Sequence, residues 1–198
     1  MVIPREPFKT LSNNVLLGLR RDYTPAPQIT KAYLLGMLHD ATERQTTYRI
    51  SSKSFEFCKV LKQGIIDLGA KAWIYKEGKD RNLWIVEFSK NLLKNTQTDS
   101  KQDKRDFIRG YFDSEGGIAK NPKVRYYIYF AQKDKKDLLR VKKFLRELGI
   151  SCGKMHNPSR RIDSDYWRFF VRAKSYNDFA KTINSSHPDK RRYLRMKI

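Results

Sequence analysis

Two apolar segments of this 198-residue chain each contain a glycine and end in an acid, at residues 34–41 (LLGMLHDA) and 108–117 (IRGYFDSEGG). Both segments have the periodicity of a helix. Because glycine inside a helix costs about 1 kcal/mol relative to alanine, Gly36 and Gly110 indicate a place where two helix backbones approach closely. We therefore expect the two helices to pack together and to bring Asp40 and Glu115 near each other at their C-terminal ends.

Two carboxylates in that position predict a metal site. The helix dipole disfavours negative charge at a C-terminal end, and two neighbouring carboxylates repel unless a cation or a proton intervenes. Hard oxygen ligands suit Mg²⁺, and bound divalent ions activate water and stabilise the leaving oxygen of a phosphodiester. The residue types at Asp40 and Glu115 thus point to metal-assisted phosphodiester hydrolysis.

The elements that must position this pair repeat along the chain. In the first copy the pattern predicts a helix over 31–38 capped by Thr30, a strand over 46–51, a helix over 54–68, a hairpin over 72–88 and a helix over 91–94. In the second copy it predicts a helix over 104–115, a strand over 124–131, a helix over 135–148, strands over 150–155 and 166–172, and a helix over 175–183. Leu148-Gly149 follows Leu68-Gly69 by 80 positions, so the fold class is α+β with an internal pseudo-twofold.

The repeat divides the chain into five segments. We expect an N-terminal extension over 1–28, a first half over 29–94, a linker over 95–103, a second half over 104–185 and a basic tail over 186–198. The tail is most simply a solvated basic end, with contacts to phosphates as the alternative. Asp113 lies two residues before Glu115, faces elsewhere on the helix and is expected to be structural.

The charge balance identifies the class of partner. Lys and Arg number 42 against 21 Asp and Glu, which gives a net charge of +21. Such a field attracts polyanions, so nucleic acid is expected ahead of an anionic membrane. The sequence offers no signal peptide and no apolar run of a membrane span's length. Its two cysteines form no disulfide framework and are expected to be free thiols. Together these features predict a cytoplasmic, nucleoid-associated protein without a membrane partner.

The two acid-ended helices resemble the paired motifs of the LAGLIDADG homing endonucleases, in the single-chain form similar to archaeal intron-encoded members. In the second motif Glu115 lies five residues after its glycine; in the first, Asp40 lies four after Gly36 and Ala41 takes the strict register. Asp40 is favoured as the metal ligand over Glu43, the other nearby acid. The resemblance implies αββαββα-like halves, Mg²⁺ or another divalent ion such as Mn²⁺ held by Asp40 and Glu115, and an enzyme that acts as a monomer.

The resemblance also implies residues that act on the scissile phosphates at the ends of two equivalent strands. Gln132-Lys133 fits the family's pair, whereas Ser52-Lys53 keeps only the lysine. Gln132, Lys53 and Lys133 are therefore catalytic candidates. The alternative for the two lysines is an ordinary solvated position at the start of a helix.

In this family, mixed and antiparallel sheets form a saddle over the DNA major groove, and this chain's strands mix cations with aromatic residues. Arginine can read guanine edges and lysine mostly contacts phosphates. Trp84 and Trp167 are assigned to the core. The DNA-binding candidates are Arg44, Arg49, Lys71, Tyr75, Lys76, Arg81, Arg125, Tyr127, Tyr129, Lys154, His156, Arg160, Arg161, Arg168 and Arg172.

The resulting expectation is a site-specific endonuclease that cuts double-stranded DNA within a long asymmetric target and promotes intron homing. Two alternatives stay open on the same scaffold: an RNA maturase that binds its own intron RNA, and a non-catalytic DNA-binding protein. The retained acids favour the enzyme, because a protein that only binds DNA gains nothing from two carboxylates facing the phosphates.

Overall fold

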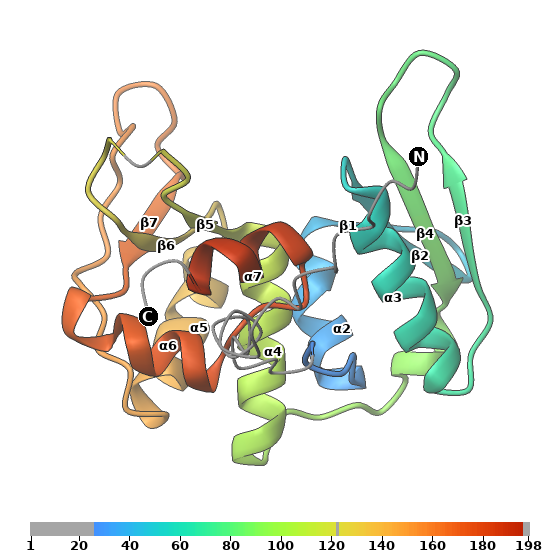
Figure 1. Cartoon of the computed structure of the whole chain (residues 1–198), viewed down its shortest axis with the longest axis horizontal. Helices are drawn as coiled ribbons and strands as arrows, with labels where there is room; N and C mark the ends of the chain where they lie inside the picture. The colour runs from blue at the N-terminus through green and yellow to red at the C-terminus, as the bar shows by residue number, and fades with distance from the viewer. Residues whose placement is uncertain (1–25, 122, 196–198) are drawn as a thin grey trace, which may run out of the picture.

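The computed structural model describes residues 26–121 and 123–195, and the predicted N-terminal extension lies mostly outside them. The chain forms two halves on either side of a central pair of helices, α2 and α4 (Figure 1). The first half contains α2 (Lys31–Met37), η1 (Leu38–Asp40), β1 (Ala41–Glu43), β2 (Thr47–Ser52), α3 (Phe55–Asp67), β3 (Ala72–Lys76), β4 (Trp84–Ser89) and η2 (Lys90–Leu93). The second half contains α4 (Lys101–Glu115), β5 (Gly116–Ile118), β6 (Ile128–Gln132), α5 (Lys135–Glu147), β7 (Trp167–Phe170), η3 (Ala173–Ser175), α6 (Tyr176–Thr182) and α7 (Pro188–Arg195). The predicted α+β class is confirmed.

Each half has its own antiparallel sheet. In the described part of the chain the first sheet has the order β1-β2-β4-β3 and the second has the order β5-β6-β7. The β3–β4 hairpin and the loop before β7 extend beyond the helices on the same side of the molecule, at the top of Figure 1. Each sheet packs one face on its helices, so its other face is available to a ligand.

Matching local signals place the matching helices of the two halves. Ser54 caps α3 by accepting a bond from the Phe57 amide, and Asp134 caps α5 by accepting from the amides of Lys136 and Asp137. Gly69 and Gly149 follow these helices with φ values of +82° and +80°, a left-handed conformation that glycine adopts without strain. The backbone therefore confirms the sequence repeat at these two positions.

The central helices touch backbone to backbone at the two predicted glycines. A Cβ added to Gly36 would lie 2.1 Å from the Phe107 carbonyl oxygen, and one added to Gly110 would lie 1.9 Å from the Tyr33 carbonyl oxygen. Neither contact leaves room for a side chain. The helix pair is thus locked in a register that brings the two C-terminal ends together.

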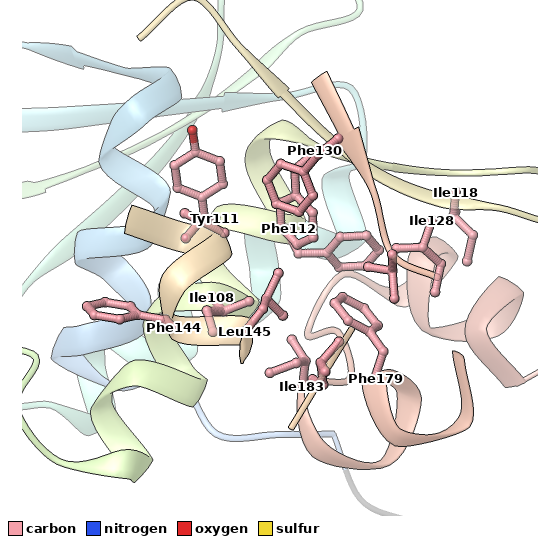
Figure 2. Close-up of a cluster of buried hydrophobic side chains, with 14 of the residues drawn as sticks. Ile108, Tyr111, Phe112, Ile118, Ile128, Phe130, Phe144, Leu145, Phe179 and Ile183 are labelled. Carbon is pink, nitrogen blue, oxygen red and sulfur yellow. The ribbon is translucent and has the colours of Figure 1, made fainter. Parts of the chain in front are cut away.

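Separate cores fix each half to this helix pair. In the second half Phe112 and Phe130 of α4 and β6 meet Phe179 of α6, with ring centroids 5.1 Å apart for Phe112 and Phe179. Figure 2 shows these rings together with Ile108, Leu145 and Ile183. The first half has an equivalent cluster around Tyr33, Leu61 and Phe88. Trp84 and Trp167 each pack against the core of their own half, as expected.

Several predicted boundaries are wrong for local reasons. Helix α4 begins at Lys101 and not at 104, because Ser100 and Asp103 form a capping box, so residues 101–103 of the predicted linker are helical. The strand predicted over 124–131 begins at Ile128, and the strand predicted over 150–155 is replaced by two isolated bridges, from His156 to Arg168 of β7 and from Cys152 to Val171 just after β7. The short helix predicted over 91–94 is a 3₁₀ turn, η2.

The expectation of a solvated C-terminal tail is also wrong. Residues 188–195 form α7, whose Leu194 side chain is 1% exposed.

Asp113 is structural, as predicted: it is buried and accepts hydrogen bonds from the Tyr33 hydroxyl (2.8 Å) and the Ser186 amide (2.8 Å). Among the described residues, no helix is both long and apolar enough to cross a membrane.

Candidate active site

Helices α2 and α4 deliver one carboxylate each to their shared C-terminal end. Helix α4 stays α-helical to Glu115, whereas α2 tightens after Met37 into the 3₁₀ turn η1, which ends at Asp40. Ala41 already belongs to β1 and pairs with Ile50 of β2. The shorter first motif therefore carries its acid on a tighter turn, and Asp40 is the acid at the helix end.

Glu43 is not brought to the same place. It lies on β1, is exposed and forms an ion pair with Lys90. His39, next to Asp40, instead contacts Asp137 of α5 at 3.0 Å and so ties the two halves together. Of the two nearby acids considered from the sequence, Asp40 is the one whose charge reaches Glu115.

The pKa values of the two carboxylates are both raised, chiefly by burial. Burial raises the pKa of Glu115, and the negative charge of Asp40 raises it further. Asp40 is exposed as a residue, but the protein around its carboxyl group raises its pKa by partial burial, and the Lys190 ammonium opposes that rise. A cation placed near these two acids would stabilise their ionised forms.

Gln132 holds Glu115 in place from the end of β6. Its amide nitrogen donates to Glu115 Oε1 at 2.8 Å, and its carbonyl oxygen accepts from the Lys133 amide at 2.6 Å. The equivalent residue in the first half, Ser52, instead accepts a hydrogen bond from the Ser54 amide at 3.1 Å. The two halves thus differ in how they support their acids.

The two candidate lysines are both exposed at the edge of this site. Lys133 forms an ion pair with Asp163 at 3.2 Å. Lys53 lines an open groove of about 420 Å³ together with Asp40 and Ser114. The same groove includes Lys120 and Lys190, two cations that sequence reasoning missed as site residues. No local pattern marks them, since each is placed by the packing of segments distant in sequence.

The donor set fits a divalent ion that completes its shell with water and phosphate. Asp40 and Glu115 offer hard carboxylate oxygens, and Mg²⁺ is commonly held by one or two carboxylates plus substrate phosphates. Within residues 26–121 and 123–195 there is no cluster of three or more His, Cys, Asp or Glu side chains arranged to hold a metal. The hard-oxygen donors that the two helix ends offer are therefore the Asp40 and Glu115 carboxylates.

The first sheet presents a polar and aromatic outer face. Arg49 Nε (2.9 Å) and the Tyr75 hydroxyl (2.6 Å) both donate to the Glu87 carboxylate in the middle of this face. Trp73, on the neighbouring strand β3, is 51% exposed. The structure leaves four other DNA-binding candidates of this half exposed: Arg44, Lys71, Lys76 and Arg81, the last of which pairs with Glu77.

The second sheet presents a stacked cluster on its outer face. The Arg168 guanidinium lies 4.7 Å from the centre of the Tyr129 ring, and the His156 ring stacks on Phe170 at 5.7 Å. Tyr127 packs against Tyr129 and remains 37% exposed. The remaining candidates of this half are exposed: Arg125, Lys154, Arg160, Arg161 and Arg172.

Comparison with known proteins identifies the family of the second half. Residues 102–184 match the model of the LAGLIDADG-like domain. An uncharacterized protein of Methanocaldococcus jannaschii is 31% identical over 117 residues, which cover 50% of this chain and 42% of that protein, so the chain spans less than half the length of this relative.

Solved structures share the fold over most of the chain. The homing endonuclease I-DmoI in complex with DNA and Mn superposes with a TM-score of 0.57 at 22% identity, covering 79% of this chain and 97% of that one. The N-terminal LAGLIDADG domain of DUF199/WhiA superposes with a TM-score of 0.62 at 16% identity, covering 81% and 84%. The chain therefore contains a LAGLIDADG-like domain at residues 102–184 and has the fold of the LAGLIDADG homing endonucleases.

Proposed function

We propose that this protein is a metal-dependent endonuclease that cuts both strands of double-stranded DNA at a specific site. The observation that carries the proposal is the locked contact of α2 and α4 at Gly36 and Gly110, which holds Asp40 and Glu115 at the midline with raised pKa values. A DNA partner is supported by the net charge of +21 and by the fold shared with I-DmoI, which has been solved in complex with DNA.

In this proposal Asp40 and Glu115 would hold Mg²⁺ or Mn²⁺, whose chemistry when bound would be to activate a water and to stabilise the leaving oxygen. Gln132 orients Glu115 through its hydrogen bond to Oε1. Lys53 and Lys133 are exposed at the strand ends, where their charge would stabilise phosphate oxygens. I-DmoI structures with Mn, Ca and Mg support divalent metals in proteins of this fold.

The outer faces of the two sheets would contact the DNA on either side of the cut. Their different side chains, a Glu87-centred network on one and a stacked aromatic cluster on the other, favour a long asymmetric target read by one monomer. We extend the proposal to intron homing as the biological role, and to a cytoplasmic location on the nucleoid.

Cleavage of a DNA library by the purified chain, with Mg²⁺, Ca²⁺ or EDTA, tests the proposal. We expect cleaved ends of defined sequence with Mg²⁺, and none with EDTA or in the Glu115→Gln variant, while binding to the selected site persists. Glu56→Gln is the matched control, because Glu56 is an exposed acid on α3 that forms an ion pair with exposed Lys59. Cleavage by Glu115→Gln at the wild-type rate would place the site elsewhere.

Specific binding without cleavage would instead favour the non-catalytic DNA-binding protein. That candidate has a specific observation behind it, since the fold is shared with WhiA as well as with a homing endonuclease. Preferential binding of intron RNA over the DNA target, with restored splicing, would favour the maturase.

A further inference from the structure

Helix α7 crosses the C-terminal end of α4 and places a lysine against its last carbonyl groups. Lys190 Nζ donates to the Phe112 (2.7 Å), Asp113 (2.8 Å) and Gly116 (2.7 Å) carbonyl oxygens. These three carbonyls surround Glu115 along the backbone. The Phe112 carbonyl also accepts from the Gly116 amide, but the last carbonyls of a helix generally lack an intrahelical partner, and a cation there both satisfies them and interacts favourably with the helix dipole.

The segment that carries Lys190 is itself anchored to both halves. Asp113 accepts bonds from the Ser185 hydroxyl and from the Ser186 (2.8 Å) and His187 (3.1 Å) amides. The His187 ring packs on Phe57 of α3, with centroids 4.4 Å apart, in the opposite half. Lys190 is thus held by contacts that also join the two halves at their catalytic end.

The hydrogen-bond count decides between two roles for this lysine. Burial lowers the pKa of Lys190 to about 8, a value that would suit a general acid. An ammonium group has three protons, however, and the three carbonyl oxygens take all of them. No proton is left to donate to a substrate, so the geometry favours support of the backbone over proton transfer.

We propose that Lys190 is a positioning residue that fixes the C-terminal turn of α4 and thereby the direction of the Glu115 carboxylate. Gln132 holds the end of that side chain, and Lys190 holds the backbone from which it extends. This inference rests on the proposed nuclease function only in its effect on cleavage. Its effect on the α4 turn does not depend on any activity.

The experiment compares wild type with Lys190→Met, which keeps the stem and removes the ammonium group. Arg192→Met is the matched control, because Arg192 is an exposed cation on the same helix that contacts Tyr193. Three quantities are measured: amide hydrogen exchange of residues 113–118 without metal, the dissociation constant for target DNA in Ca²⁺, and the single-turnover cleavage rate in Mg²⁺.

For Lys190→Met we expect exchange at 113–118 to accelerate by about 10-fold, and cleavage to slow by about 10–100-fold, as is usual when a supporting partner of a ligand is lost. The DNA dissociation constant should stay within about 2-fold of the wild-type value, a split that general unfolding would not produce. Arg192→Met should match wild type in all three quantities.

Unchanged exchange in Lys190→Met, or cleavage lost only in proportion to DNA binding, would overturn the proposal. If Lys190→Met does not fold, Lys190→Arg is the deciding variant, because the planar guanidinium cannot direct protons at three converging oxygens. A folded Lys190→Arg protein should then show faster exchange and slower cleavage, each by less than in Lys190→Met, with DNA binding little changed. Wild-type exchange and a wild-type cleavage rate in Lys190→Arg would overturn the proposal. If wild type cuts no DNA, the nuclease proposal fails, and the exchange measurement still decides the role of Lys190.

Discussion

Replacing Gly110 by alanine tests whether the helix contact sets the position of the two acids. The new Cβ would lie 1.9 Å from the Tyr33 carbonyl oxygen and 3.3 Å from the Met37 amide nitrogen. Both are backbone atoms of α2, so neither can rotate away, and the helices must separate. Overpacking of this kind costs about 3 kcal/mol at its upper range, and the better helix propensity of alanine returns about 1 kcal/mol.

The expected net loss is about 2 kcal/mol, which for a chain of this size corresponds to a decrease of about 4–8 °C in Tm. A displacement of about 1 Å between the acids would also slow cleavage by about 100-fold. The assays are thermal unfolding and single-turnover cleavage of the target DNA. Gly153→Ala is the control, because its Cβ would lie at an ordinary 3.5 Å from the Phe170 carbonyl oxygen. A Gly110→Ala protein with wild-type Tm and wild-type cleavage would refute this account of the helix pair.

Three further outcomes are expected, two at this site and one at the first sheet. Because the folded state raises the pKa of Glu115, its ionised form destabilises the metal-free protein above that pKa; Glu115→Gln should therefore raise the free energy of unfolding at pH 7 by up to about 1 kcal/mol after solvent screening, and a decrease in urea titrations would contradict this. Protons and metal compete for Asp40 and Glu115, so the pH of half-maximal cleavage on the acid side should fall as Mg²⁺ increases, whereas a fixed midpoint would argue against shared ligands. Lys71→Ala, at the exposed residue just before β3, should weaken DNA binding and reduce the slope of log K against log salt by about 1; an unchanged slope would remove Lys71 from the interface.

The elements that place the site could be predicted where local signals agree. Gly36 and Gly110 are costly in helices unless backbones touch, and the structure has that contact. Gly69 and Gly149 end their helices with positive φ, as a repeat of 80 positions requires. In such places the residue type has one physical explanation, and the sequence is sufficient.

Errors arose where a contact distant in sequence overrides local character. Residues 188–195 are strongly basic and resemble a solvated tail, yet Lys190 is enclosed because carbonyls more than 70 positions away accept its protons. The strand predicted over 150–155 is reduced to bridges at Cys152 and His156. The composition of these segments does not indicate the distant contacts that determine their structure.

The register of the first motif was open to two interpretations from the sequence. Spacing alone could not choose between Asp40 and Glu43, because it depends on whether α2 ends as an α-helix or as a tighter turn. The 3₁₀ turn η1 ends at Asp40 and directs the chain into β1, where Glu43 pairs with Lys90. The backbone geometry of three residues therefore decides which acid reaches the midline.

Anomalous scattering from Mn²⁺ in crystals of the protein bound to its target DNA is the most direct test of the central claim. The account predicts a peak between the Asp40 and Glu115 carboxylates and beside a phosphate of the DNA. Peaks at other side chains, with both carboxylates free of metal at saturating Mn²⁺, would contradict it.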